Sequence, residues 1–486
     1  MAEPHVGTVP SPVGLPFPAP SFPGLLPEDR QPVIIAARRT PLCRANGALK
    51  TLRAHELLAP VLRSLLAEAG AGAGLAPESV TDVVIGNAVG GGGNVARLAA
   101  LEAGLPITVP GVTVDRQCGS GLDAIVLASR LVAAGGGGLY LAGGVESIST
   151  APLRAHRNDD GSPDYYSRAQ FAPLSLGDPD MGVAAENVAA HFGISRERQD
   201  AFALRSHHRA LAAAAAGRFA GEIVPLRAGS GAAAEADDGP RPSLGPALMA
   251  RFPPVFASGG TVTAGNSCFD ADGAAAVVIT SMERARQLGA ADGLLVLGTD
   301  TAGVAPQLLG IGAAVAAQRL LAAHGLTAAD LGLVEFNEAF AAQTLACFDQ
   351  LGIDPEQANL DGGALALGHA YGASGAVLVT RLLAQARRSA EPGQLALAMI
   401  SIAGGMGTAA PMPRSCGATP AVLVPSTSNP SAAPRRSPAL TSWGLTRSWR
   451  TSTAGRWLWV TPTEPRARCW SPGCSHKHAG PRSPAS

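Results

Sequence analysis

The sequence predicts an α/β protein built from two similar halves, and two observations carry that prediction. From about residue 31 to residue 410, apolar strand-like runs alternate with helix-like runs, which is typical of layered α/β sheets. The segments 118–147 and 371–407 also share one order of features: a glycine-containing turn, a helix, a strand and a glycine pair. Such an internal repeat indicates two copies of one structural unit.

The expected elements follow one another along both halves. Apolar and β-branched runs predict strands at 32–37 (PVIIAA), 81–89 (TDVVIGNAV), 274–280 (AAAVVIT), 294–299 (LLVLGT) and 331–336 (LGLVEF). The run LDAIVLASRLVAAG at 122–135 predicts a buried helix. Residues from about 150 to 250 are more polar and include an amphipathic run at 195–217. We therefore expect an inserted loop domain there, placed to cover a site.

The two ends of the chain differ in composition from its centre. Residues 1–30 are proline-rich and predict a disordered extension. Residues 412–486 are basic, lack apolar periodicity and hold all five tryptophans. A low-order tail and translation in a shifted reading frame both fit that segment. The expected organisation is an extension (1–30), an N-terminal half (31–285), a C-terminal half (286–411) and a tail (412–486).

Bulk composition argues against several classes of protein. The formal net charge is zero, which gives no electrostatic reason to expect nucleic acid as a partner. No window approaches 18 uninterrupted apolar residues, so we expect no membrane span, and no secretory signal pattern opens the chain. Seven cysteines without a repeating spacing are typical of a reducing compartment. We therefore expect a cytoplasmic protein without a metal site.

The stretch RQCGSGLDAI at 116–125 places Cys118 directly before a glycine-serine-glycine turn. Ser120 and Asp123 match a capping box that would start the following helix. A helix N-terminus favours a thiolate, so we expect the pKa of Cys118 to fall below the free value of about 8.5. From this local context two interpretations stay open: a small buried apolar residue and a nucleophile.

Four loops carry the residue types that covalent acyl transfer needs. They are CGSG at 118–121, NEAF at 337–340, GHAYGASG at 368–375 and SIAGGMG at 401–407. Loops at strand ends of both halves can meet in one crevice. There, His369 would take the thiol proton of Cys118, and Asn337 would help to polarise an oxygen. Taken alone, Asn337 fits equally well as a helix N-cap and His369 as a turn residue.

These segments resemble those of the thiolase family over about residues 31–410. Six segments match in order: CGSGL, MGVAAENVA, ISRERQDAFALRSHHRA, GTVTAGNSCFDADGAAAVV, NEAFAAQ and GGALALGHAYGASGA. The resemblance implies a five-layer αβαβα fold with an inserted loop domain. It also implies an acyl-CoA C-acyltransferase of fatty acid and lipid metabolism, with acyl-CoA and CoA as substrates and no further cofactor. A homodimer or homotetramer is the implied assembly.

The resemblance further implies a role for each site residue. Cys118 would be the acyl-enzyme nucleophile. His369 would activate it and bind the thioester oxygen, with Asn337 holding a water in the same oxyanion hole. The backbone N–H groups of Cys118 and Ala403 would form a second hole. The implied CoA contacts are Met181, Arg241, Ala264, Gly265, Cys268, Ala339 and Phe340.

Ser401 is the largest departure from the thiolase pattern. Thiolases carry a cysteine at this position as the acid/base at the substrate α-carbon. A serine hydroxyl ionises several units above a thiol of pKa about 8.5, so we expect slower carbon–carbon chemistry but not slower acyl loading. Three functions stay open. The first is a thiolase that thiolyses 3-oxoacyl-CoA or condenses acyl-CoA units, with Ser401 or another group moving the proton. The others are an acyltransferase without Claisen activity and a non-catalytic CoA-binding subunit.

Overall fold

The computed structural model describes residues 26–69, 75–229, 233–290, 292–389 and 394–416. Residues 1–25 of the predicted extension (1–30) and residues 417–486 of the predicted tail (412–486) lie outside the described residues. Of the described parts of these two segments, Glu28–Arg30 form a 3-10 turn and residues 412–416 belong to a strand of the sheet. Within the described ranges no helix is long and apolar enough to cross a membrane. The same ranges contain no cluster of three or more His, Cys, Asp or Glu side chains that could hold a metal ion.

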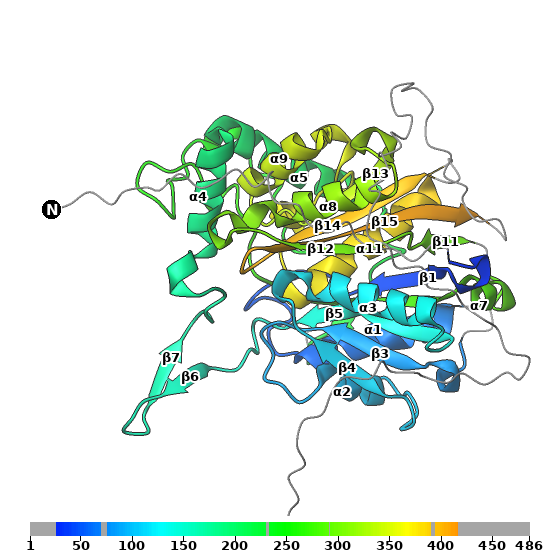
Figure 1. Cartoon of the computed structure of the whole chain (residues 1–486). Helices are drawn as coiled ribbons and strands as arrows, with labels where there is room; N and C mark the ends of the chain where they lie inside the picture. Colours follow the sequence, from blue (N-terminus) through cyan, green and yellow to red (C-terminus); the bar gives the residue numbers. More distant parts are fainter. Residues whose placement is uncertain (1–25, 70–74, 230–232, 291, 390–393, 417–486) are drawn as a thin grey trace, which may run out of the picture. The chain divides into compact units, whose positions relative to one another are not determined.

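One mixed sheet runs through both halves (Figure 1), in the strand order β13-β14-β15-β11-β1-β10-β5-β3-β4, with β12 paired to β15 and β2 to β10. The N-terminal half contributes β1 (Pro32–Arg39), β2 (Cys43–Arg44), β3 (Asp82–Gly86), β4 (Gly111–Val114), β5 (Leu139–Glu146) and β10 (Ala271–Ser281). The C-terminal half contributes β11 (Asp292–Leu295), β12 (Asp300–Gly303), β13 (Leu331–Phe336), β14 (Leu395–Ile402) and β15 (Met406–Cys416). The β13–β14 pair is parallel, so both strands end at the same edge.

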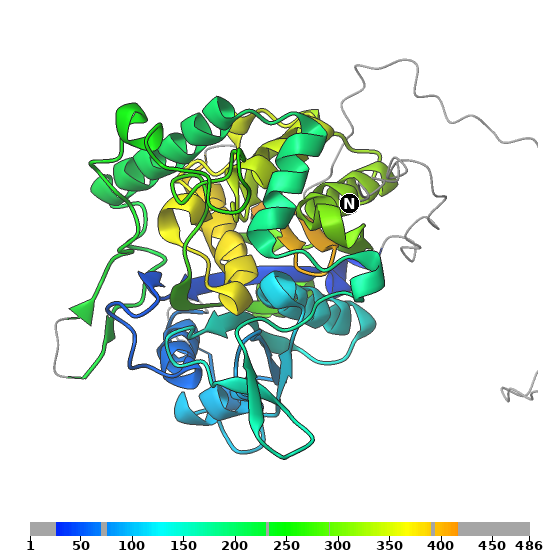
Figure 2. The same ribbon diagram turned by 90° about the vertical axis from the view of Figure 1, so that its left-hand side faces the viewer.

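The N-terminal and C-terminal parts of this sheet form two layers, and helices form three more, one between them and one on each outer face. In the central layer, α3 (Ser120–Ala134) and α11 (Tyr371–Arg388) pack against each other and share one buried core with strands of both halves (Figure 2, cyan and yellow). On the outer face of the N-terminal strands lie α1 (Ala54–Glu68) and α2 (Val95–Glu102). On the outer face of the C-terminal strands lie α8 (Gly312–Ala323) and α9 (Ala341–Leu351). The predicted αβαβα order is therefore confirmed.

The segment between β5 and β10 interrupts this layering. It starts with a hairpin of β6 (Arg154–Arg157) and β7 (Pro163–Tyr166), which extends away from the main sheet (Figure 1). The helices α4 (Met181–Phe192), α5 (Arg196–Ala215) and α6 (Pro246–Met249) follow. The predicted amphipathic helix is α5, which Ser195 caps by accepting a hydrogen bond from the Arg198 N–H at 3.3 Å.

The predicted strands of both halves are present as β1, β3, β10, β11 and β13. The strand predicted at 294–299 is shorter than expected, because β11 ends at Leu295. The predicted capping box is wrong. Ser120 lies inside α3, and its hydroxyl donates to the Gln117 carbonyl at 2.7 Å instead of capping the Asp123 N–H. A 3-10 turn at Gln117–Gly119 runs directly into the helix and takes the place of the cap.

Glycines allow the first turns of α3 and α11 to touch. A Cβ on Gly121 would lie 2.6 Å from the Gly372 carbonyl oxygen, and one on Gly375 would lie 2.4 Å from the Leu122 nitrogen. A Cβ on Gly144 of β5 would lie 1.8 Å from the same carbonyl oxygen. Real Cβ atoms essentially never approach closer than 3.0 Å. Only glycine therefore permits this packing, and Gly121 and Gly375 hold matching places in the two repeats.

Gly121→Ala tests this close approach. The added methyl group overpacks the contact with α11, so we expect a loss of about 1–3 kcal/mol in the free energy of unfolding. Gly138→Ala is the control, since a Cβ there meets nothing within 4 Å. Urea unfolding of both variants decides the matter. An equal, small loss in both would show that the helices tolerate a wider separation.

Candidate active site

Cys118 lies in a tight turn between β4 and α3. The turn is entered through Gln117 at a φ of 47°, a left-handed conformation that residues other than glycine rarely adopt. The Ser120 hydroxyl holds the turn, because it accepts from the Arg116 N–H at 2.8 Å and donates to the Gln117 carbonyl at 2.7 Å. Such strained backbone concentrates at functional sites. The turn therefore favours the nucleophile over the inert interpretation of Cys118.

The environment of the Cys118 thiol contradicts one expectation. Burial raises its pKa to about 12, whereas the N–H groups of Ala403 and of Cys118 itself lower it, and Glu146 and Asp115 raise it further. The expected fall below the free value is therefore wrong for the resting thiol, because desolvation outweighs the helix N-terminus. Both N–H groups act on the sulfur, and Ala403 reaches it from the turn between β14 and β15. The two groups predicted to form one oxyanion hole are thus brought together.

His369 precedes α11 and is 3% exposed. Its Nδ1 lies 2.6 Å from the Ser374 hydroxyl, which itself donates to the Ala370 carbonyl at 3.0 Å. Since the hydroxyl proton is used, Nδ1 carries the ring proton and donates it to Ser374. The sequence matched Ser374 to Ser120 as a repeat position but missed this role.

The tautomer leaves Nε2 of His369 as a lone-pair acceptor. In the described part of the chain Nε2 has no hydrogen-bond partner. Burial lowers the pKa of His369 to about 4, so the ring is neutral at neutral pH. A neutral imidazole whose Nε2 lone pair is free can accept a proton from a thiol, but the lowered pKa of His369 and the raised pKa of Cys118 both oppose that transfer in the resting protein.

Asn337 follows β13 directly and is 2% exposed. Its backbone N–H donates to the Met399 carbonyl at 3.3 Å and ties the end of β13 to β14. Its side-chain Nδ2 is buried without a partner among the residues that the structure describes. A buried donor of this kind is rare and indicates an acceptor from outside the chain, such as a water or a substrate oxygen. The N-cap alternative is wrong, because Phe340 is the N-cap of α9.

Ser401 lies near the end of β14 and is 5% exposed. Its hydroxyl donates to the Gly310 carbonyl at 2.7 Å and accepts from the Ala313 N–H at 3.1 Å. It also hydrogen-bonds the Cys347 thiol, whose pKa is raised mainly by burial. These contacts lie on the α8 side of the sheet. The hydroxyl is therefore engaged by backbone groups of its own half and is not hydrogen-bonded to Cys118.

Five of the seven predicted CoA contacts lie on two loops that pair with each other: Ala264, Gly265, Cys268, Ala339 and Phe340. The Cys268 N–H donates to the Ala339 carbonyl at 2.9 Å, and Phe340 forms a β-bridge with Ser267. Gly265 is buried and Ala264 is exposed. The structure thus brings these five positions together at the N-terminus of α9.

The other two predicted CoA contacts lie on separate elements. Met181 is the first residue of α4, and Arg241 lies in an exposed loop before α6. The Arg241 N–H donates to Nδ1 of His207 at 3.2 Å. Burial, followed by the charges of Arg241 and Arg44, lowers the pKa of His207 to about 4. This neutral histidine leaves two guanidinium groups as a local positive charge, which suits a phosphate.

Glu146 is a site residue that the sequence analysis missed. It ends β5 and accepts hydrogen bonds from the Asn87 side chain at 2.7 Å, the Ala88 N–H at 3.0 Å and the Gly372 N–H at 2.9 Å. Burial raises its pKa to about 7, and the backbone N–H groups oppose that shift. Glu146 thus ties the N-terminal half to the start of α11. The sequence feature that could have identified Glu146 is a single carboxylate at the end of an otherwise apolar strand.

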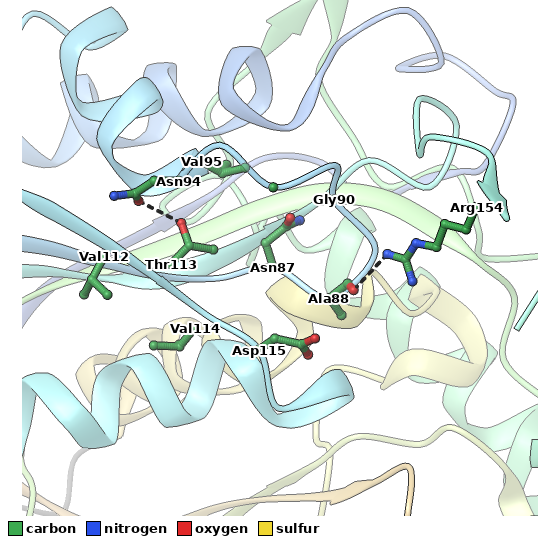
Figure 3. A pocket seen from close by; sticks show the side chains of 11 residues that line it. Asn87, Ala88, Gly90, Asn94, Val95, Val112, Thr113, Val114, Asp115 and Arg154 are labelled. Atoms are coloured by element: carbon green, nitrogen blue, oxygen red, sulfur yellow. Dashed lines mark hydrogen bonds between the residues drawn. The ribbon is translucent and has the colours of Figure 1, made fainter. Parts of the chain in front are cut away.

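A cavity of about 520 Å³ lies beside β4, and Figure 3 shows its lining. Arg154 closes one side by donating to the Ala88 carbonyl at 3.2 Å. Asp115 is the lining residue closest in sequence to Cys118. None of the predicted CoA contacts lines this cavity, so it is separate from the predicted CoA site.

Family comparisons cover the layered region almost completely. The model of the thiolase N-terminal domain matches residues 32–283, and that of the thiolase C-terminal domain matches residues 295–414. The chain belongs to the thiolase family. The resemblance noted in the sequence is therefore confirmed, and the structure described above is a thiolase fold with its two halves in sequence order.

Individual thiolases agree with this assignment. The chain is 44% identical over 378 residues to "Putative acetyl-CoA C-acetyltransferase YhfS" of Bacillus subtilis, covering 78% of this chain and 97% of that protein. It is 43% identical over 387 residues to "Putative acetyl-CoA C-acetyltransferase VraB" of Staphylococcus aureus, covering 78% and 98%. The crystal structure of the Bacillus anthracis acetyl-CoA acetyltransferase matches with a TM-score of 0.72 at 35% identity, covering 79% and 98%.

The pH dependence of Cys118 alkylation tests the electrostatics of the site. With a thiol pKa near 12 and a neutral His369, iodoacetamide labelling should rise about tenfold per pH unit, hence about 100-fold from pH 7 to pH 9. Cys118→Ala gives the background from the other thiols. A profile that is already flat between pH 6 and pH 7 would contradict the account, because it would reveal a preformed thiolate–imidazolium pair.

Proposed function

We propose that this thiolase is an acyl-CoA C-acyltransferase that carries its acyl group on Cys118. The observation that carries the proposal is the convergence at one thiol of groups from both halves. The Ala403 N–H of the C-terminal half acts on the Cys118 sulfur. His369, which is neutral and has no partner for Nε2 among the described residues, lies two residues before the end of α11 that packs against α3. The printed names of the relatives, which are acetyl-CoA acetyltransferases, support acetyl-CoA as a substrate.

Acyl loading follows from these groups. Nε2 of His369 takes the Cys118 proton as the sulfur attacks the thioester carbonyl carbon. The carbon–sulfur bond to CoA then breaks, and the CoA thiolate takes the proton from His369. Because the thiol and the imidazole are both neutral at rest, no buried ion pair has to persist between turnovers.

Developing charge on the carbonyl oxygen meets preorganised donors. The N–H groups of Cys118 and Ala403 already face the sulfur, and Asn337 offers a buried amide donor that has no partner in the part of the chain that the structure describes. Donors fixed before the reaction cost no reorganisation during it. We assign the two backbone N–H groups to one oxyanion hole, and His369 with an Asn337-bound water to the other.

We propose that the complete reaction is either the thiolysis of a 3-oxoacyl-CoA or the condensation of two acyl-CoA units. A 3-oxoacyl-CoA loses its terminal acyl group to Cys118, or two acyl-CoA units join. CoA thioesters are the substrates, and no further cofactor is needed. The paired loops at residues 264–268 and 339–340, with Met181 and Arg241, are proposed to bind CoA. We place this reaction in cytoplasmic lipid metabolism and propose a homodimer or homotetramer as the working form.

The hydrogen bonds of the Ser401 hydroxyl support the alternative of an acyltransferase without Claisen activity. The Ser401 hydroxyl donates its one proton to Gly310 and accepts from the Ala313 N–H with one of its two lone pairs. Because its proton is held by a backbone carbonyl, it is poorly placed to move an α-proton. We therefore propose that Ser401 stabilises the β14–α8 contact. Carbon–carbon chemistry then needs another acid/base, and without one the chain would be limited to acyl transfer to other acceptors.

Acylation of Cys118 is the first test. After incubation with acetyl-CoA, peptide mass mapping should find a thioester-linked acetyl group on Cys118, and Cys118→Ala should abolish it. Cys118 is the thiol to which both halves direct polar groups, whereas Cys43 and Cys347 are buried in apolar clusters. Acetylation of Cys43 or Cys347 with Cys118 unmodified would refute the proposal.

Ser401→Ala tests the structural role of the hydroxyl. Loss of its partners leaves the buried Ala313 N–H unsatisfied, so the free energy of unfolding should fall by about 1–3 kcal/mol, with acetylation of Cys118 unchanged. Ser64→Ala is the control, because its exposed hydroxyl donates to the side chain of Glu68 at 2.8 Å and not to a backbone group. A Ser401→Ala protein of unchanged stability that has lost thiolysis would instead make Ser401 the acid/base.

A further inference from the structure

A pair of polar side chains beside His369 takes no part in the acyl loading described above. The Tyr371 hydroxyl donates to Oδ1 of Asp270 at 2.5 Å. The Tyr371 ring meets the His369 ring edge-on, with centroids 5.1 Å apart. These two contacts place the pair next to the imidazole that is proposed to activate Cys118.

The backbone of Asp270 is fixed against the same histidine. The two residues form a parallel β-bridge. The His369 N–H donates to the Phe269 carbonyl at 2.9 Å, and the Ala271 N–H donates to the His369 carbonyl at 3.3 Å. Asp270 is thus held from both sides by hydrogen bonds to one partner. A carboxylate mounted in this way has a defined position relative to the reacting centre.

Two further observations place Asp270 and Tyr371 near the thiols of Cys118 and Cys268 and at a pocket. Burial raises the pKa of the Tyr371 hydroxyl, and the nearby Asp270, Cys118 and Cys268 raise it further. Burial likewise raises the pKa of the Cys268 thiol, and Asp270 and Cys118 add to that shift. Asp270 and Tyr371 also line a pocket of about 360 Å³. The other lining residues are mostly apolar or aromatic: Val89, Ile148, Ala151, Pro152, Leu153, Arg154, Tyr165, Tyr166 and Ser167. Asp270 is exposed, so a molecule in the pocket reaches its carboxylate.

We propose that Asp270 is the acid/base at the substrate α-carbon and that Tyr371 is the positioning residue that holds its carboxylate. This proposal rests on the proposed acyl transfer through Cys118 and supplies the group that Ser401 does not provide. An aspartate that faces an apolar pocket and keeps one fixed hydrogen bond retains a second oxygen for the substrate.

The step balances as follows in the condensing direction. Asp270 takes a proton from the α-carbon of the second acyl-CoA, and the electron pair of that C–H bond attacks the carbonyl carbon of acyl-Cys118. A carbon–carbon bond forms and the carbon–sulfur bond to Cys118 breaks, which releases a thiolate. Asp270 gives the α-proton to water at the exposed pocket, and Nε2 of His369 takes a proton from water and passes it to the thiolate, so that the net transfer is of one proton from the α-carbon to Cys118. Thiolysis runs the same steps backward.

The variants Asp270→Asn and Tyr371→Phe distinguish an acid/base at Asp270 from a purely structural pair. Asparagine keeps an oxygen that accepts from Tyr371 but cannot take a proton, whereas Tyr371→Phe removes the clamp and keeps the carboxylate. Asp164→Asn is the matched control, since it removes an exposed carboxylate from β7, beside the pocket residue Tyr165. The readout is deuterium uptake at the methyl group of acetyl-CoA in D₂O, followed by NMR, with Cys118 acetylation measured on the same samples.

We expect Asp270→Asn to slow deuterium uptake by about 10²- to 10⁴-fold, with Cys118 acetylation nearly unchanged. Tyr371→Phe should slow uptake by a smaller factor, and Asp164→Asn should leave it unchanged. Native uptake in Asp270→Asn, or a loss in Tyr371→Phe as large as in Asp270→Asn, would overturn the proposal. Absent Cys118 acetylation in the unaltered protein would instead refute the proposed function, and deuterium uptake would still decide the role of Asp270.

Discussion

The contact between the first turns of α3 and α11 is the constraint on which the site depends. It is made by glycine against backbone: Gly121 and Gly144 both face the Gly372 carbonyl at distances that no side chain allows. Cys118 lies two residues before α3, and His369 lies two residues before α11. The spacing of the helices therefore sets the spacing of the thiol and the imidazole, and the Glu146 hydrogen bond to the Gly372 N–H fixes it further.

Burial of this contact determines the protonation states of the two groups. In a dry interface a charged thiolate and a charged imidazolium are both costly, and the pKa directions of Cys118 and His369 follow from that cost. In the proposed reaction the proton therefore moves only when the substrate binds. Burial lowers the nucleophilicity of Cys118, and we propose that the fixed donors of Ala403 and Asn337 offset this loss by stabilising the charge that develops on the substrate.

The repeat and the strand–helix alternation were sufficient to predict the layered fold, because both follow from local apolar patterns. Cys118, His369 and Asn337 were predicted as a set from turn residues at the strand ends of two repeats, and their joint role stays a prediction. The thiol pKa could not be predicted, since burial depends on how α3 packs against the other half. The hydrogen-bond partners of Ser401 could not be predicted either, because strand alternation alone does not show which backbone groups next to α8 face its hydroxyl. Nothing in the local sequence marked Asp270 as a site residue, and only its hydrogen bond with Tyr371 in the structure identified it as a candidate.

The central claim is that Cys118 carries the acyl group between donors supplied by both halves. A crystal structure of the protein after reaction with acetyl-CoA tests it most directly. The account predicts an acetyl group on the Cys118 sulfur, with its carbonyl oxygen at a hydrogen-bond distance of about 3 Å from the N–H groups of Cys118 and Ala403. An acetyl group on another residue, or an acetyl oxygen turned away from both N–H groups, would contradict it.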